Sequence, residues 1–317
     1  DTISAGAGTG NLTIKGEDGD DSINATAAAG DDNIDGGTGN DTIAGGTGDD
    51  TITGGDGNDQ ITDAGGKNVL DGGNGNDSFT LSGGTTASSD TVTGGAGNDV
   101  VSVGAGHGKD LINTGDGNDS VNAGGAASAQ TIIGGTGNDT LIGGAGSDSI
   151  SAVAGKDILS GGAGNDTIHG STGNDTITGG TGTDVLFGGG GGDLFVFNSA
   201  GAGDSNAVAG TLDQIRDWNG GTTAAPTNFL HFNDTTGATM AAGTTLNYTE
   251  TTGTDFTDAT AQANAHLGTS GKYVAVQIGT DVVVFADTNN DHSITAADTA
   301  VVLVGKSLAD IDFSNII

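Results

Sequence analysis

The chain has no cysteine, one proline (Pro226) and one methionine (Met240) among its 317 residues. Without cysteine, no disulfide can hold the fold together. Only seven residues are basic against 41 acidic ones, and the formal net charge of −34 argues against binding to nucleic-acid phosphates or anionic membranes. No apolar run approaches the roughly 20 residues of a membrane-spanning helix. Aromatic residues make up 4% of the chain, so a thick conventional core is not expected over most of its length.

Glutamate is also nearly missing, because Glu17 and Glu250 are the only two and the other acidic residues are all aspartates. A chain selected only for acidity or solubility would mix the two residue types freely. Aspartate places a short carboxylate at a fixed point beside a tight turn. Hard cations such as calcium bind oxygen ligands of this kind.

Glycine, by contrast, accounts for 64 residues and recurs with a period of nine. In the unit Gly36–Ala44, "GGTGNDTIA", glycines precede an aspartate at position 6 and an apolar residue at position 8. Twenty full units fit the sequence as far as Val196, with short inserts between some of them. The first four residues, "DTIS", fit the end of another unit. We therefore expect the chain to begin inside a repeat, as the C-terminal piece of a longer protein.

Two positions of the repeat are nearly invariant. Position 8 is apolar in every unit, from Leu12 in the first to Phe195 in the last. Position 6 is aspartate in all but three units, in which it is Gly10, Asn68 or Gln130. A flexible glycine-rich linker would not keep an apolar residue at one phase so many times.

This pattern resembles the RTX nonapeptide, a calcium-binding β-helix repeat, over about residues 1–197. The resemblance implies an all-β fold: a parallel β-roll in which positions 1 to 6 form a turn, positions 7 to 9 form a short strand, and two units make one coil. It also implies multiple calcium ions as the cofactor. Residues 198–317 are predicted to form a mainly β C-terminal cap with one short helix.

The energetics favour coupling between folding and metal binding. Burying one aliphatic side chain contributes about 1.5–3 kcal/mol, whereas ordering nine residues costs about 1–2 kcal/mol for each backbone unit. Stacked coils also bring carboxylates close together, and these repel one another. A divalent cation between stacked turns offsets both costs.

Successive turns alternate between two edges of the roll. We call the row of position-6 residues that begins at Asp1 the first edge, and the row that begins at Gly10 the second edge. On the first edge the predicted calcium ligands are Asp21, Asp41, Asp59, Asp77, Asp99, Asp119, Asp139, Asp157, Asp175 and Asp193. On the second edge they are Asp32, Asp50, Asp148, Asp166 and Asp184.

All three exceptions at position 6 fall on the second edge, which also carries Asp90 and Asp110. The sequence therefore predicts a near-continuous row of calcium ions on the first edge and an interrupted row on the second. The turn "AVAGKD" before Asp157 has lost two glycines and is predicted to be the weak point of the first edge.

The tail holds a second kind of candidate site. In "DTNNDHSITAAD", the ligands Asp287, Asn289, Asp291 and Asp298 fall at positions 1, 3, 5 and 12 of an EF-hand-like loop. His292 stands where that loop needs glycine, so an Asx-rich turn without metal is the alternative. Elsewhere in the tail we expect a helix over residues 255–268, a hairpin turning at Gly279 and Thr280, and strands in "DQIRDW" and "TAVVLVG".

The sequence contains no H-E-x-x-H motif, no G-x-S-x-G motif and no cysteine nucleophile. We therefore interpret the chain as non-enzymatic. It resembles the C-terminal region of type I-secreted RTX proteins, which implies an extracellular location and a secretion signal in the terminal "SLADIDFSNII" that the type I secretion machinery binds.

Within that class, the length of the roll and the low content of Lys, Cys and Met favour a bacterial surface-layer (S-layer) protein. Its main partner would then be copies of itself in a lattice at the cell surface, with no nucleic acid and no transmembrane segment involved. An RTX adhesin remains an alternative. So does the secretion and folding module of an RTX protease, lipase or epimerase.

Overall fold

The computed structural model describes residues 1–82, 88–197, 212–218, 229–232, 250–253, 256–267, 273–287, 294, 299–306 and 308. The chain divides into two compact units, Asp1–Ile158 and Leu159–Ile317. Within the described ranges, no helix is long and apolar enough to cross a membrane. The predicted division between a roll at 1–197 and a cap at 198–317 stays a prediction.

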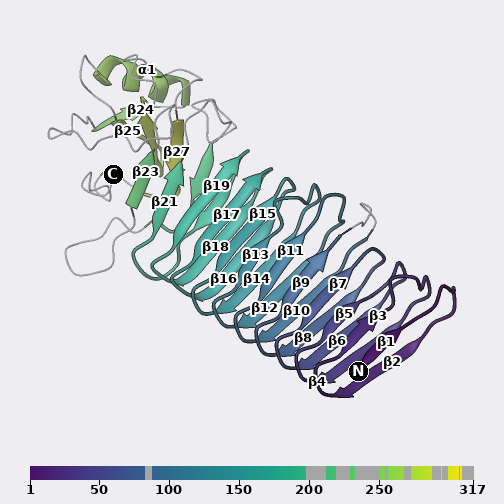
Figure 1. Cartoon of the computed structure of the whole chain (residues 1–317). Coiled ribbons are helices and arrows are strands. Elements are labelled where there is room, and N and C mark those ends of the chain that lie inside the picture. Colours follow the sequence, from purple (N-terminus) through teal and green to yellow (C-terminus); the bar gives the residue numbers. More distant parts are fainter. Residues whose placement is uncertain are drawn as a thin grey trace. The chain divides into compact units, whose positions relative to one another are not determined.

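The first unit is a parallel β-solenoid whose coils stack one on the next (Figure 1). One of its sheets contains β1 (Thr2–Ser4), β3 (Ser22–Asn24), β5 (Thr42–Ala44), β7 (Gln60–Asp63), β9 (Ser78–Leu81), β11 (Val100–Val103), β13 (Ser120–Asn122) and β15 (Thr140–Gly144). The other contains β2 (Thr13–Asp18), β4 (Asn33–Thr38), β6 (Thr51–Asp56), β8 (Val69–Asn74), β10 (Thr91–Ala96), β12 (Leu111–Asp116), β14 (Thr131–Thr136) and β16 (Ser149–Gly155). The predicted parallel β-roll is confirmed.

Strand pairing stacks the position-8 side chains into two internal columns. In one sheet Ile43 pairs with Ile23 and Ile61, and in the other Leu70 pairs with Ile52 and Val92. These side chains are at most 1% exposed, while their strand neighbours alternate outward as the period of two requires. The columns form most of the apolar core of the coils, to which further buried residues such as Leu81, Val103 and Ala152 add.

The predicted register is wrong in the first full coil. Ile14, not Leu12, pairs with Ile34 and points inward. Leu12 stands at position 6, where its N–H donates to Asp32 Oδ1 at 2.8 Å. Leu12 and Ile14 lie two residues apart, and either one fits position 8 of the repeat in the sequence. Only the pairing of Ile14 with Ile34 distinguishes them. The second edge therefore begins at Leu12 and not at Gly10.

Turn glycines are required where the backbone enters the left-handed region. Gly37 and Gly39 at positions 2 and 4 have φ of 113° and 126°, and the same pair recurs along the first edge. Three other residues occupy position 2 with positive φ: Glu17, Val153 and Ser171. Val153, with φ of 96°, lies in the turn predicted to be weak, and a β-branched residue there costs about 1–3 kcal/mol of strain.

The second unit begins with further coils of the same kind. Its first strands are β17 (Ile158–Ala163), β18 (Thr167–Gly173), β19 (Thr176–Thr181), β20 (Val185–Phe187) and β21 (Leu194–Phe197). The register does not end there, because β22 (Asp213–Ile215) pairs with β20 and places Ile215 beside Leu186. β23 (Phe229–Phe232) pairs with β21 in the same way. Fourteen residues, 198–211, separate this coil from the last nonapeptide repeat, so the period of nine is interrupted in the sequence.

The rest of the second unit is a small α+β layer on the edge of β22. β27 (Thr299–Leu303) pairs with β22, and β26 (Asp281–Ala286), β25 (Tyr273–Ile278) and β24 (Glu250–Gly253) follow in order. The hairpin turns at Gly279 and Thr280, as predicted. Helix α1 (Phe256–Leu267) is confirmed and buries Ala259 and Ala263 against β25 and β26.

Candidate calcium-binding site

The position-6 aspartates from Asp21 onward are buried, although a carboxylate normally faces water. Along the first edge, each backbone N–H at this position donates to Oδ1 of the aspartate in the following coil, over 2.7–2.9 Å. The donors in the first unit are Asp21, Asp41, Asp59, Asp77, Asp99, Asp119 and Asp139, and Asp157 accepts the last of these bonds. Oδ1 is therefore used by the fold itself, which ties each coil to the next.

The second oxygen of these carboxylates has a different environment. Oδ2 of Asp21, Asp41, Asp59, Asp77, Asp99, Asp119 and Asp139 is buried and has no hydrogen-bond partner among the described residues. A buried anion without a partner is costly, and such groups are normally paired or coordinate a metal. The row therefore offers one unsatisfied anionic oxygen for each coil.

A second oxygen lies next to Oδ2 in most of these turns. Asp41 Oδ2 and the carbonyl oxygen of Gly54 both border the point that a Cβ on Gly36 would fill. We call this arrangement an oxygen cradle. It recurs around Gly16, Gly54, Gly72 and Gly94 in the first unit and around Gly161 and Gly170 in the second.

The cradle explains why position 1 is glycine. Any Cβ there would overlap the carboxylate and the carbonyl that converge on it. Thr114 and Ala152 are the exceptions on the first edge, and the Thr114 hydroxyl donates to the carbonyl oxygen of Gly134 at 2.8 Å. The donor set of an intact cradle, carboxylate plus backbone carbonyl, is the set that calcium prefers. The residues present thus fit calcium.

The same burial shifts the acidity of the row. Desolvation raises the pKa of Asp59, Asp99 and Asp139 to about 6, and the neighbouring carboxylates add to the rise. Desolvation also raises the pKa of Asp41 and Asp77. In the absence of metal, the folded row therefore binds protons more tightly than the unfolded chain does.

Acid is expected to replace part of the calcium requirement. Because the folded pKa of Asp59, Asp99 and Asp139 is about 6 and exceeds the unfolded value of about 3.9, the stability of the metal-free fold falls as pH rises through this window. Calcium-free protein should thus show more β-structure by circular dichroism at pH 5.5 than at pH 8. With millimolar calcium present this difference should vanish or reverse, because protons then compete with the ion. Equal spectra at both pH values without calcium would contradict the prediction.

The second edge is interrupted where an amide replaces the carboxylate. Asn68 Oδ1 accepts the Asp50 N–H at 2.8 Å, and its NH₂ group donates to Asp63 Oδ1 at 2.6 Å. Gln130 behaves likewise, and its NH₂ group donates to the carbonyl oxygens of Gly108 and Ser128. In both turns the position-6 side chain thus presents an N–H donor where an aspartate would present a second carboxylate oxygen to a cation.

The remaining second-edge ligand candidates keep the ladder geometry. Asp32 N–H donates to Asp50 Oδ1 at 2.8 Å, and Gln130 N–H donates to Asp148 Oδ1 at 2.6 Å. In the second unit, the backbone N–H of Asp166 donates to Asp184 Oδ1. On the first edge, the backbone N–H of Asp175 donates to Asp193 Oδ1. The ladder also continues to a residue that the sequence reasoning missed, because Asp184 N–H donates to Asp213 Oδ1 at 2.8 Å.

A second ladder, at position 5, was also missed. Asn58 N–H donates to Asn40 Oδ1 at 2.8 Å, and Asn76 N–H donates to Asn58 Oδ1 at 2.7 Å. These bonds run toward the preceding coil, opposite to the aspartate bonds. The recurrence of "ND" at positions 5 and 6 was the signal, and each residue of the pair ties the turn to one of its two neighbours.

The EF-hand-like loop is only partly described. Asp287 is buried at the end of β26, whereas Asn289, Asp291 and Asp298 lie outside the described residues. The terminal "SLADIDFSNII" also lies outside them, apart from Leu308. The metal site in this loop and the secretion signal therefore stay predictions.

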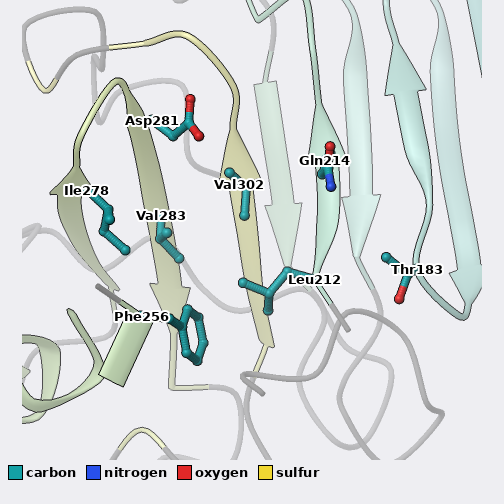
Figure 2. Close-up of a pocket in the computed structure, with 8 residues that line it drawn as sticks. All are labelled: Thr183, Leu212, Gln214, Phe256, Ile278, Asp281, Val283 and Val302. Atoms are coloured by element: carbon teal, nitrogen blue, oxygen red, sulfur yellow. The ribbon is translucent and has the colours of Figure 1, made fainter. Parts of the chain in front are cut away.

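A pocket of 310 Å³ in the second unit is the alternative candidate site (Figure 2). It is lined by Thr183, Leu212, Gln214, Phe256, Ile278, Asp281, Val283 and Val302. Asp281 is the one titratable group in this lining, and its Oδ1 already accepts the Gly305 N–H at 2.7 Å. Figure 2 shows Asp281 and Gln214 on different strands, β26 and β22. The described lining brings together no acid–base pair and no activated nucleophile.

The fold and the oxygen cradles define a metal-binding parallel β-roll. A family model for the RTX calcium-binding nonapeptide repeat matches residues 1–28, 26–61, 53–85, 85–109, 108–128, 125–159 and 160–195. The chain belongs to this family, and its many repeats bind multiple calcium ions. The repeat roll is a structural calcium-binding arrangement, and no catalytic family is identified in the chain. A comparison with curated proteins gives no match.

Proposed function

We propose that this chain is the calcium-dependent structural part of a secreted bacterial cell-surface protein, the C-terminal region of an S-layer protein. The observation that carries the proposal is the row of oxygen cradles in stacked turns. In the first-edge turns from Asp21 to Asp99, each turn supplies a buried carboxylate oxygen that the fold leaves for a cation. Calcium would supply positive charge between stacked turns and so join successive coils.

The ligands proposed for these ions are the position-6 aspartates. On the first edge of the first unit, Oδ2 of Asp21, Asp41, Asp59, Asp77 and Asp99 forms a cradle with a backbone carbonyl oxygen, so these turns are the best-formed sites. In the Asp119 turn, Thr114 replaces the glycine at position 1, and the atoms closest to a Cβ on Gly134 include Asp139 Oδ2 but no backbone carbonyl oxygen. The centre of the second edge, where Asn68 and Gln130 donate amide hydrogen bonds, is proposed to bind no calcium at those two turns.

Assembly at a cell surface is supported by the length of the roll and by the charge of the chain. Repeats occupy most of the chain, which is more than we expect for a module that only aids the folding of an enzyme. The net charge of −34 keeps individual chains apart until a divalent cation screens them. Copies of the same chain are the proposed partner, and export through the type I secretion machinery would place them in millimolar calcium outside the cell.

Electron microscopy of the purified chain tests this function. With millimolar calcium we expect ordered two-dimensional sheets, and after chelation we expect them to disperse. The unfolded starting state and a calcium-folded sample should be compared by circular dichroism in parallel. A chain that folds with calcium but stays monomeric in sedimentation would refute the surface-layer role and favour the adhesin or the enzyme module.

A further inference from the structure

The middle of the second edge contains a turn unlike the others. In "AGHGKD", residues 105–110, position 3 is His107, and its side chain is 0% exposed. The residues at the same position of other second-edge turns, Ala29, Thr47 and Ala127, are exposed. This turn therefore directs an imidazole into the roll at a place where the repeat normally faces solvent.

His107 meets two buried carboxylates there. Asp90 precedes β10 and Asp110 precedes β12, and the pairing of these strands sets Thr91 beside Leu111 and so stacks the two aspartates. His107 Nδ1 lies 3.4 Å from Asp90 Oδ2. One ligand atom from each of Asp90, His107 and Asp110 can be chosen so that all three lie within 4.8 Å of one another.

The cluster leaves its polar atoms unsatisfied. Neither nitrogen of His107 makes a hydrogen bond within the described ranges, and Oδ2 of Asp110 has no hydrogen-bond partner there either. Asp110 Oδ1 is already used, because it accepts the Asp90 N–H at 2.9 Å. Leaving such groups buried without partners costs about 1–3 kcal/mol each, and more when they are charged. A ligand shared by all three would remove this cost.

We propose that Asp90, His107 and Asp110 bind a first-row transition-metal ion, with Zn²⁺ the best match, at a site separate from the calcium cradles. Zinc binds imidazole nitrogen and carboxylate oxygen at about 2.0–2.2 Å, which places neighbouring tetrahedral ligands about 3.3 Å apart. The Nδ1–Oδ2 separation of 3.4 Å agrees with this spacing. Calcium takes oxygen ligands at longer distances, so the imidazole selects against it.

The proposal also explains how the interrupted edge is held together. Asn68 and Gln130 flank this cluster along the second edge, one coil before Asp90 and one coil after Asp110. Their amides satisfy the turns that lack a carboxylate, and the metal satisfies the two turns between them. The competing explanation is that His107 is protonated and neutralises Asp90 and Asp110 without any metal.

Cobalt and zinc titrations of the full chain in millimolar calcium test the site. Calcium occupies the cradles, and Co²⁺ bound by a histidine and carboxylates gives visible absorption that zinc should displace. We expect a single tight site in the natural chain and binding about 100-fold weaker or worse in His107→Gln. His169→Gln is the matched control, because His169 is only partly buried and stacks on Phe187 at 4.3 Å.

A fold defect must be separated from lost metal binding. Circular dichroism in calcium should show that His107→Gln retains the roll. If it does not, Asp110→Asn keeps the Oδ1 acceptor for the Asp90 N–H and should weaken cobalt binding as strongly. Equal cobalt affinity in His107→Gln and the natural chain would overturn the proposal. So would a natural chain that binds no cobalt or zinc, which would leave the protonated histidine as the explanation.

Discussion

Chelation of calcium at neutral pH is expected to unfold the stacked coils of the roll. An ion at one hundred times its Kd stabilises the folded chain by about 2.7 kcal/mol for each site. Several such sites together match or exceed the net stability of a typical domain, about 5–15 kcal/mol. Without the ions, the buried carboxylates of Asp41, Asp59 and Asp77 face one another unscreened. Far-UV circular dichroism should therefore lose most of its β-signal on chelation and regain it when millimolar calcium is restored.

Magnesium provides the matched control for this experiment. It requires near-octahedral geometry at about 2.0–2.1 Å and gives up its water reluctantly, so it should not restore the fold at the same concentration. The unfolding should be reversible, because the chain has no disulfide to reshuffle and only Pro226 to isomerise. A β-signal that persists after complete removal of calcium would show that the hydrophobic columns suffice, and would contradict the coupling of folding to metal.

Much of this architecture could be predicted from the sequence because the pattern of each nonapeptide repeat indicates which residues form the strand and which form the turn. The fixed spacing between an apolar residue and an aspartate gave the strand, the turn and the alternation of edges. The predictions that failed share a cause. Leu12 and Ile14 both satisfy the local pattern, and only the partner strand decides between them. The coil at Asp213 was missed since an insertion breaks the period, although the local spacing of Asp213 and Ile215 is intact.

The candidate site was predictable in its residue types but not in its detail. A sequence shows which residue stands at position 6, but not that Oδ1 is consumed by the neighbouring N–H while Oδ2 is left over. His107 could not be recognised as a cluster member, because its partners lie in two different coils and position 3 normally faces solvent. Contacts between coils depend on the inserts between units, and these vary along the chain.

Substitution of Gly137 by alanine is expected to be strongly destabilising, because stacking leaves no room for a side chain. Gly137 has φ of 130°, and a Cβ on it would overlap the carbonyl oxygen of Gly117 in the preceding coil. The positive φ alone costs alanine about 1–2 kcal/mol. The collision is with backbone and cannot be relieved by a rotamer change, so the coils must separate, which adds about 1–3 kcal/mol. Urea unfolding in millimolar calcium should show a large fall in the midpoint.

Two further glycines separate the torsional cost from the stacking cost. Gly19 has a similar φ of 112°, but a Cβ on it would meet nothing within 4 Å, so Gly19→Ala should lose the torsional part only. At Gly190 the nearest atom would be the Ser171 carbonyl oxygen at 3.9 Å, and Gly190→Ala should change the midpoint little. If Gly137→Ala were no worse than Gly19→Ala, the coils would not be held at the separation described. Direct stacking of turns, on which the oxygen cradles depend, would then be wrong as well.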